Sequence, residues 1–297
     1  MNVLRDYLEQ GCALSTLLRI LELPRSSYYY RPTGRKAGKR SSSIFRKRGR
    51  QVSLEGLVGD IKDLLSGEFV DYGYYKTYVY LRDELGYSIG STRVYRIMKQ
   101  HKLLRFQRGQ AKRTNRNWVK ELVPVVEKPF RFLELDIKYV YLQGTRSNAM
   151  VLTVIDVFSR WNLGHYIAYS IGKTDVVRLF KHLLKEYPDV KGCTVRNDNG
   201  SQFIARRVQE FLKESDIIQE FTMPATPEQN AHIESYHSIM ESAVCQRFEF
   251  ENMQDFKETM ERFRVFYNFR RIHGGVGYTS PAKFLEKNGV FMSQKVA

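Results

Sequence analysis

The sequence predicts an α/β protein in which all-helical units precede a larger domain built on a mixed five-stranded sheet. Before about residue 105 the apolar residues recur at helical spacing, whereas after residue 130 they follow strand-like patterns. Towards the C-terminus, helical and strand-like segments alternate, which is typical of a sheet flanked by helices. The 297 residues suffice for two or three domains and at least one substantial core.

Positive charge is concentrated in the N-terminal part of the chain. The formal net charge is +16, and residues 1–120 hold 25 Lys and Arg against 10 Asp and Glu. Residues 121–297 hold 23 against 22. Such a basic region attracts the phosphate backbone of double-stranded DNA through counterion release, and a merely soluble basic surface is the alternative.

The composition excludes several classes of protein. No apolar run approaches the 18 or more residues of a membrane span, and the charged start MNVLRDYLEQ does not resemble a secretory signal. A cytoplasmic protein is therefore expected. Cys12, Cys193 and Cys245 lie far apart, which argues against a disulfide framework or a cysteine-rich zinc site.

Residues 1–32 predict a helix-turn-helix-like unit. The stretch ALSTLLRILEL spaces its leucines along one helical face, Pro24 ends that helix, and PRSSYYY starts another. Two short helices across a tight break suggest a helix-turn-helix, and an ordinary helical hairpin is the alternative.

Residues 33–53 predict a flexible basic linker. The run RPTGRKAGKRSSSIFRKRGR, residues 31–50, has nine Lys and Arg, no acidic residue and several Gly and Ser. Such a segment can lie along DNA.

Residues 54–115 predict a second helix-turn-helix domain, followed by a linker over 116–126. Helices are expected over 54–65, 74–85 and 91–103. On the last helix, apolar residues point inward and basic residues share the outer side, as a groove-reading helix requires, with a solvated charged face as the alternative. The inward residues are Val94, Ile97 and Met98, and the expected DNA contacts are Arg93, Arg96 and Lys99.

Residues 127–288 are expected to form the α/β domain, and residues 289–297 are expected to form a tail. Three strand-like segments are followed by a helix, a strand, a helix, a strand and two further helices. The strand segments are FRFLELDIKYVYLQ, AMVLTVIDVFS, NLGHYIAYS, GCTVRND and IIQEFTM. The helices are TDVVRLFKHLLKEY, SQFIARRVQEFLKES, a stretch from Glu228 to about Val244, and MQDFKETMERFRVFYNF. This is the element order of an RNase H-like fold.

Three carboxylates occupy positions that suit metal chemistry. Asp136 lies in the first strand, Asp198 ends the fourth strand on the turn Asn-Asp-Asn-Gly, and Glu234 lies one or two turns into a helix. That turn sequence alone favours a plain turn, because Asn, Asp and Gly tolerate left-handed backbone. Strands one and four are neighbours in the expected sheet, however, so their carboxylates can meet. Hard oxygen ligands of this kind suit two Mg²⁺ ions, for which Mn²⁺ can substitute.

Two further acidic residues need separate consideration. Glu134 shares the strand face of Asp136 and is either an auxiliary ligand or, as we favour, a surface residue. Asp156, in VIDVFSRW, is expected to end its strand and hydrogen-bond the turn.

The spacing of the three carboxylates carries a family resemblance. Asp136 and Asp198 are 62 positions apart, and 35 residues separate Asp198 from Glu234. This looks like the D, D, thirty-five, E signature of retroviral integrases. The neighbouring motifs resemble the insertion-sequence-three family of bacterial DDE transposases, at its catalytic second-frame protein. The motifs are VIDVFSRW, NDNGSQF, QNAHIES, YNFRRIHGGVGYTSP and the upstream YGYYKTYVYLRDELGYSIGSTRVYRIMKQHKL. The resemblance covers most of residues 10–288.

The resemblance implies an activity and the residues that carry it out. It implies that Asp136, Asp198 and Glu234 form a metal-binding catalytic triad that cleaves element ends and transfers the freed 3′-OH to target DNA. It further implies five DNA-approaching or helix-positioning residues: Asn199, Gln202, Asn230, Arg271 and His273.

One position departs from the family pattern. Relatives usually carry Lys or Arg seven residues after the catalytic Glu, whereas this chain has Glu241, on the same helix face as Glu234. A carboxylate there repels phosphate. Arg247 or a basic residue elsewhere substitutes for it, or the copy is degraded. His237 is either a phosphate or base contact or a plain exposed histidine.

Two other functions compete with the transposase interpretation. A transposase-derived regulator would bind DNA through the helix-turn-helix units without catalysis, and an RNase H-type nuclease or Holliday-junction enzyme would share the fold. Pairing two DNA ends requires at least two protomers, so self-association is expected. Many relatives also use a small upstream-frame protein with a helix-turn-helix and a zipper as a partner.

Overall fold

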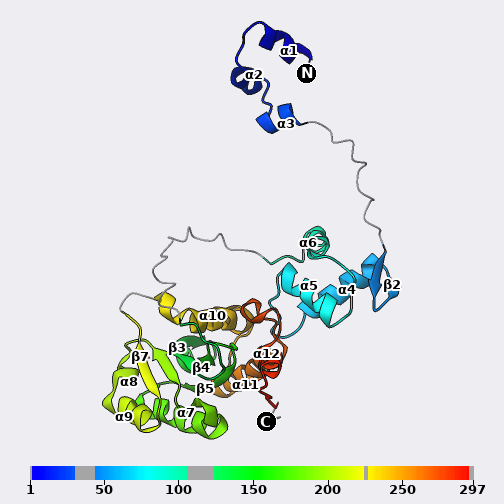
Figure 1. The fold of residues 1–297 in the computed structure, drawn as a ribbon. Coiled ribbons are helices and arrows are strands. Elements are labelled where there is room, and N and C mark those ends of the chain that lie inside the picture. The colour runs from blue at the N-terminus through cyan, green and yellow to red at the C-terminus, as the bar shows by residue number, and fades with distance from the viewer. Residues whose placement is uncertain (1, 31–43, 106–123, 224–226, 294–297) are drawn as a thin grey trace. The chain divides into compact units, whose positions relative to one another are not determined.

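A computed structural model describes residues 2–30, 44–105, 124–223 and 227–293 (Figure 1). The chain divides into two compact units, residues 1–43 and 44–297, and each is described by itself. The expected linker segments 33–43 and 116–123, the end of the second helix-turn-helix domain (106–115) and the last residues of the tail lie outside the described residues.

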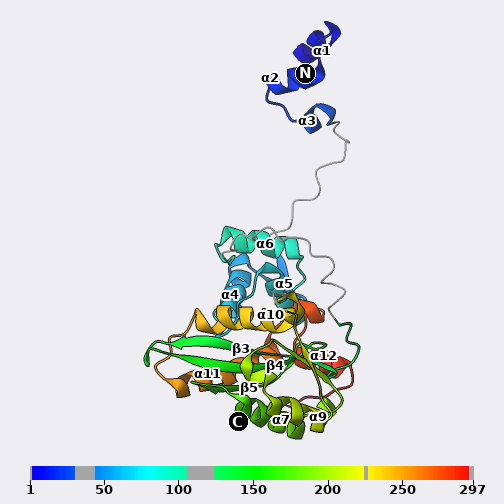
Figure 2. The ribbon, with the colours of Figure 1, turned by 90° about the vertical axis from the view of Figure 1, so that its left-hand side faces the viewer.

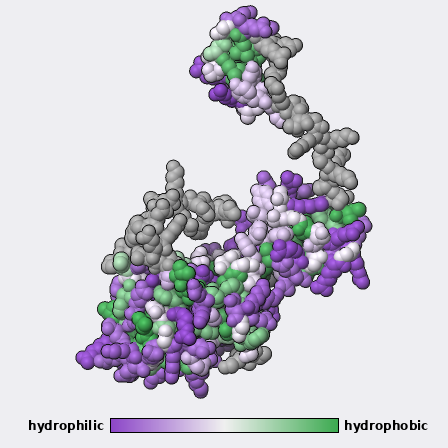
Figure 3. Space-filling view, in the orientation of Figure 1, coloured by the Kyte–Doolittle hydropathy of each residue, from purple (hydrophilic) through white to green (hydrophobic). Residues whose placement is uncertain are grey.

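The described part of the N-terminal unit contains three short helices, and the last two are the pair that the sequence predicts. They are α1 (Asn2–Glu9), α2 (Leu14–Ile20) and α3 (Arg25–Tyr29). Hydrophobic residues show at the surface of this unit (Figure 3), where Ile20, Leu21 and Leu23 are exposed. The role of this unit in DNA binding stays a prediction.

A compact helical domain follows in the second unit. It consists of α4 (Leu54–Leu65), α5 (Tyr74–Asp83) and α6 (Ser91–Gln100). Helix α4 begins where predicted because the Ser53 hydroxyl accepts the Gly56 N–H at 3.1 Å, a side-chain N-cap. Val94, Ile97 and Met98 are buried on the inner face of α6, which confirms the inward-facing pattern.

The expected linker over 33–53 is wrong for its last residues. Strands β1 (Phe45–Lys47) and β2 (Arg50–Val52) form an antiparallel hairpin. Phe45 is buried in the core of the helical domain, and Lys47 pairs with Asp60 of α4 at 2.6 Å. These contacts to distant residues hold the basic segment in place, and the local sequence pattern of the segment does not predict them.

The larger domain is built on the predicted mixed five-stranded sheet. Its strands are β3 (Phe132–Leu142), β4 (Ser147–Asp156), β5 (Asn162–Ala168), β6 (Thr194–Asn197) and β7 (Ile218–Phe221). The spatial order is β5-β4-β3-β6-β7. Strands β3, β4 and β5 pair antiparallel, whereas β6 pairs parallel with β3 and with β7. This order is that of an RNase H-like fold.

Helices cover both faces of the sheet (Figures 1 and 2). On one face, α7 (Lys173–Glu186), α8 (Ser201–Ile204) and α9 (Arg206–Glu214) close a core that contains Leu133 and Leu135 of β3. The predicted single helix over 201–215 is divided, because Ala205 adopts an extended backbone.

On the other face, α10 (Ala231–Met240) and α11 (Met253–Val265) close a second core with Val140 and Leu142 of β3. A 3₁₀ turn (Pro227–Asn230) precedes α10, and π-helical turns follow α10 (Glu241–Cys245) and α11 (Phe266–Arg270). A further 3₁₀ turn (Gly274–Val276) and α12 (Pro281–Lys287) complete the domain.

The loop between α4 and α5 joins the helical domain to the α/β domain. Phe69 inserts among Phe248, Phe263 and Phe266, with ring centroids 5.5–5.7 Å apart. Asp71 is buried, and its carboxylate accepts hydrogen bonds from both terminal nitrogens of Arg271, one of them at 3.0 Å.

The expected DNA contacts Arg271 and His273 need correction. Both side chains are buried, Arg271 in the ion pair with Asp71 and His273 against the ring of Tyr267. Burial lowers the pKa of His273 well below its usual value, so this ring is neutral. In this structure the two residues hold the fold together and are not exposed to DNA.

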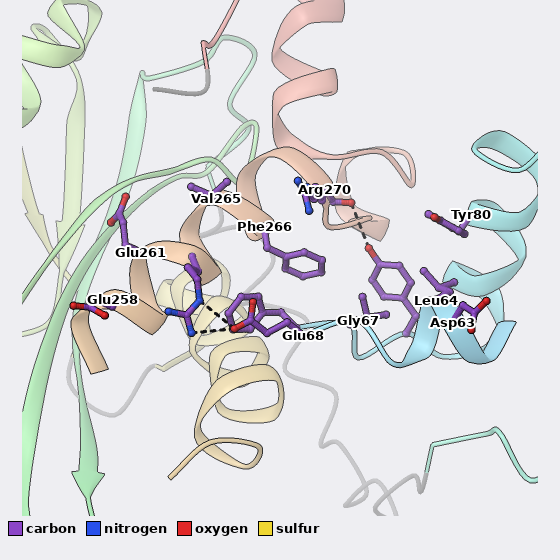
Figure 4. Close-up of a pocket in the computed structure, with 14 residues that line it drawn as sticks. Asp63, Leu64, Gly67, Glu68, Tyr80, Glu258, Glu261, Val265, Phe266 and Arg270 are labelled. Carbon is purple, nitrogen blue, oxygen red and sulfur yellow. Dashed lines mark hydrogen bonds and ion pairs between the residues drawn. The ribbon is translucent and has the colours of Figure 1, made fainter. Parts of the chain in front are cut away.

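A cleft of about 810 Å³ lies beside this junction (Figure 4). Helices α4 and α11 line it, Arg262 reaches across to Glu68 at 3.0 Å, and Tyr72 donates to the Arg270 carbonyl at 3.4 Å. None of the three candidate catalytic carboxylates lines this cleft, so it is not the candidate active site.

In the described ranges, no helix has the length and apolar content that a membrane-crossing segment needs.

Candidate active site

Strand β3 presents charged residues to only one side of the sheet. Leu133, Leu135 and Ile137 belong to the core under α7 and α9. Side chains alternate along a strand, so Glu134, Asp136 and Lys138 lie on the opposite face, towards α10. Helix α10 packs on β3 and β4.

The parallel pairing of β3 and β6 ends two residues before Asp136 and Asp198. The last paired residues are Glu134 and Arg196. Two residues further along each chain stand Asp136 and Asp198, so both carboxylates follow the same register. Adjacent strands lie about 4.8 Å apart. The Asp136 side chain is 27% exposed and Asp198 is exposed, so both carboxylates are accessible to a ligand.

The turn that carries Asp198 is fixed by its neighbours to the adjacent strand β7. Gln219 of β7 donates to Asn197 Oδ1 at 2.9 Å, and Asn197 donates to the Asp198 carbonyl. Asn199 donates to the Thr222 carbonyl at 3.0 Å. The two asparagines therefore position the turn from both sides of Asp198.

The turn forms without the left-handed backbone that its residues tolerate. None of its residues has a positive φ, and Gly200 has φ −59°. A Cβ on Gly200 would lie 2.4 Å from Gln202 Nε2 and 3.0 Å from Asp198 Oδ1, so both side-chain ends would have to move to admit it. The same carboxylate oxygen accepts the Gly200 N–H at 3.0 Å. The small residue thus lets the Asp198 carboxylate fold against the backbone.

Glu134 fixes the start of α10 to the sheet. Its carboxylate accepts the Ile233 N–H at 2.7 Å and contacts His232 Nδ1 at 2.8 Å. Glu134 is fully buried, so our preference for a surface residue is wrong. A carboxylate at a helix N-terminus also interacts favourably with the helix dipole. The next residue, Glu234, is exposed in the first turn of α10.

Two more contacts continue along α10. His237 is buried and its Nδ1 lies 3.4 Å from Asp136 Oδ2, so the alternative of an exposed histidine is wrong. Glu241 Oε2 lies 3.0 Å from Lys138 Nζ. Glu241 therefore does not face the site as an unpaired carboxylate.

Arg247 does not supply the basic side chain that relatives carry at the position of Glu241. It donates to backbone carbonyls of the α4–α5 loop, at 2.8 Å for Val70 and 3.3 Å for Glu68.

The remaining expected DNA contacts lie in different environments. Arg96 and Lys99 are exposed on α6, whereas Arg93 is half-buried with its guanidinium 4.3 Å from the Phe45 ring centroid. Asn199 is exposed and Gln202 is half-buried.

Asn230 directly precedes α10 and is buried, so its side chain is not displayed to DNA. Its position agrees better with the expected role of setting the start of the helix.

Asp156 behaves as the sequence predicts. It ends β4 and accepts the Ser159 N–H at 2.8 Å, the Ser159 hydroxyl and the Phe130 N–H at 3.0 Å. Burial raises the pKa of Asp156, and the hydrogen bonds from Ser159 oppose that shift. Its oxygens are occupied by the turn, which confirms a structural role.

Asp136 and Asp198 offer the hard oxygen donors that a divalent metal ion prefers. Both are accessible, and the side chain that pairs with Asp136 is a histidine ring and not a Lys or Arg. Among the described residues, no three acidic, histidine or cysteine side chains are already gathered as a metal cluster. The donor types of Asp136 and Asp198 are those that a divalent metal ion prefers.

Sequence reasoning missed the roles of Glu134, Lys138 and Asp71. The alternation Glu-x-Asp-x-Lys in β3 was the available signal for the first two, since it places all three charges on one face. No comparable signal marks Asp71, whose partner lies 200 positions away.

Family models match three segments of this chain. Two integrase core domain models match residues 126–227 and 215–281, and a helix-turn-helix-like domain model matches residues 54–111.

Known proteins similar to this chain come from several bacterial mobile elements. The InsK protein of insertion sequence element IS150 of Escherichia coli is 25% identical, and the match covers 92% of this chain and 93% of InsK. The transposase of element IS904 of Lactococcus lactis is 29% identical, covering 48% of this chain and 58% of that protein. The transposase of element IS629 of Shigella sonnei is 24% identical, covering 54% and 53%.

Among solved structures, a simian T-cell lymphotropic virus intasome aligns with a TM-score of 0.47 at 11% identity, covering 80% of this chain and 79% of that chain. The integrase core of bovine immunodeficiency virus aligns with a TM-score of 0.41 at 18% identity, covering 54% and 96%. These scores are too low to carry an argument, and the fold assignment rests on the strand order.

Proposed function

This chain belongs to the DDE transposases of the retroviral integrase superfamily and resembles the insertion-sequence-three family, and we propose that Asp136, Asp198 and Glu234 are its catalytic carboxylates. The enzyme is a polynucleotidyl transferase that cleaves and joins DNA strands. The proposal concerns which residues do so and how.

The register of β3 and β6 is the observation that carries the proposal. The pairing of Glu134 with Arg196 ends two residues before Asp136 and Asp198, and the Glu134 contacts hold the first turn of α10, which contains Glu234, against β3. This register and this helix anchor support the proposal that the three carboxylates act at one site.

The chemistry consists of a hydrolysis followed by a transesterification. In the first, a water oxygen attacks the phosphorus at the element end; a new P–O bond forms, the bond to the 3′-oxygen breaks, and that oxygen leaves as a 3′-OH. In the second, this hydroxyl loses its proton and attacks a target phosphodiester, whose own 3′-oxygen leaves. Phosphoryl chemistry of this kind depends on positioning and charge stabilisation.

Integrase-family DDE enzymes use divalent metal ions, which when bound activate the attacking oxygen and stabilise the leaving oxygen. We propose that the three carboxylates hold two Mg²⁺ ions and that Mn²⁺ substitutes. The residues around them orient the carboxylates: Asn197 and Asn199 fix the turn of Asp198, and His237 contacts Asp136.

Integrase and helix-turn-helix-like domains imply DNA binding, and we propose that α6 contributes to it. Arg96 and Lys99 are exposed on its outer side, where they can pair with phosphates. The exposed Asn199 and the half-buried Arg93 and Gln202 stay proposed DNA contacts.

Strand transfer by this class of enzyme involves an oligomer on DNA. We propose at least a dimer that pairs two element ends at the bacterial nucleoid. A small upstream-frame helix-turn-helix and zipper protein is a candidate additional partner.

Strand transfer in Mg²⁺ with labelled DNA from the sequences that flank the gene tests the proposed site. The wild type should give joined products, whereas Asp198→Asn should lose them at least 10³-fold while still binding DNA, because it removes a charged ligand without changing the side-chain size. Strand transfer by Asp198→Asn at the wild-type rate would contradict the assignment. None of the observations favours the non-catalytic regulator, which would bind DNA but give no metal-dependent joining in any variant.

A further inference from the structure

Three side-chain contacts connect β3 to α10 and the residue after it, and they follow the same order along the strand and the helix. Going along β3, Glu134 meets His232, Asp136 meets His237 and Lys138 meets Glu241. From residue 134 to 138 a strand rises about 13 Å, and from residue 232 to 241 a helix rises about 14 Å. The strand and the helix therefore run in the same direction, and the Lys138–Glu241 pair lies one step beyond Asp136.

Lys138 is well placed to meet DNA bound at Asp136. The two residues share one face of β3 and are separated by about 7 Å along the strand. The Lys138 side chain is 23% exposed and that of Glu241 is 42% exposed, so the pair is accessible from solvent. An amino group at this distance reaches the phosphate next to one held at Asp136.

We propose that Lys138 is a phosphate-binding residue of the active site and that Glu241 holds it when DNA is absent. The inference rests on the proposed catalytic role of Asp136. The cation that this site requires comes from strand β3, and its partner is the Glu241 carboxylate, directly after α10. Partly exposed ion pairs are weak, so a DNA phosphate can displace Glu241 from Lys138.

The two partners have opposite expected effects on DNA binding. Lys138→Gln removes a phosphate contact and should weaken binding roughly tenfold and reduce the slope of log affinity against log salt by about 1. Glu241→Gln releases Lys138 from its competitor and should strengthen binding about threefold. If the pair were only structural, both substitutions would weaken binding alike, so the sign of the Glu241→Gln effect separates the two roles.

The experiment measures fluorescence anisotropy of the full chain with a duplex from the sequence flanking its gene, in EDTA, at several salt concentrations. Glu210→Gln is the control for the loss of one surface carboxylate, since it frees Arg206 from an exposed i,i+4 ion pair on α9, at 2.7 Å. It should change affinity by less than twofold. Circular dichroism melting of each variant checks that the fold is kept.

An unchanged salt slope in Lys138→Gln, or weaker binding by Glu241→Gln, would overturn the proposal. The charge-exchanged double variant Lys138→Glu, Glu241→Lys should bind the DNA duplex within about threefold of the wild-type affinity, because a cation remains at the position of the Lys138–Glu241 pair. Wild-type strand transfer is assayed in parallel. If the wild type joins DNA and Lys138→Gln binds normally, the Lys138 proposal alone fails; if the wild type never joins DNA, the catalytic proposal fails independently of the binding result.

Discussion

Removal of the Glu134 carboxylate should loosen the first turn of α10. The side chain is fully buried and accepts the Ile233 N–H at 2.7 Å, with His232 at 2.8 Å. Hydrogen bonds to a charged group contribute about 1.5–3 kcal/mol each, and an abandoned buried donor adds its own cost. Glu134→Ala should therefore lower the free energy of unfolding by about 3–5 kcal/mol.

A conservative variant separates positioning from charge. Glu134→Gln keeps an acceptor for the Ile233 N–H and should cost only about 1–2 kcal/mol. It should recover most of the strand transfer that Glu134→Ala loses, because Glu234 follows directly after the anchored residue. Glu286→Ala, an exposed glutamate on α12, should change stability by less than about 0.5 kcal/mol.

Urea unfolding followed by circular dichroism gives the stability, and hydrogen exchange at the Ile233 amide reports the first turn directly. That amide should exchange faster in Glu134→Ala by more than the global change in stability explains. If Glu134→Ala unfolds within about 0.5 kcal/mol of the wild type, or if the Ile233 amide keeps its protection, the reasoning about this anchor is wrong.

Two further predictions concern the domain junction and the Asp198 turn. The ion pair with Arg271 outweighs burial and lowers the pKa of Asp71 from 3.8 to about 2, so Asp71 contributes about 2 kcal/mol of stability that is present above pH 4 and is lost as the pH falls towards 2. Urea unfolding at pH 6 and pH 3 should show a smaller loss in Asp71→Asn than in the wild type, and an equal loss would contradict the assignment. Gly200→Ala should keep the fold but lower strand transfer at least tenfold, because its Cβ displaces the Asp198 carboxylate, whereas Gly172→Ala, with no atom within 4 Å of its Cβ, should be active; full activity of Gly200→Ala would show that the turn tolerates the methyl group.

Local sequence patterns determined the elements of this protein and the identity of the three candidate carboxylates. Helix α4 follows its predicted bounds because its apolar spacing and its Ser53 cap are local features. The long strands follow from their apolar runs, and the spacing of Asp136, Asp198 and Glu234 is a property of the linear chain alone.

Only the tertiary structure decided which charged side chains are buried and what they pair with. Glu134 meets His232 from 98 positions away, and Asp71 meets Arg271 from 200 positions away. The pairing of Lys138 with Glu241, and the burial that makes Arg271 and His273 structural, arise in the same way. Periodicity reports which face of its own element a residue occupies, but not which distant element covers that face, and it is the covering element that sets the environment of each charge.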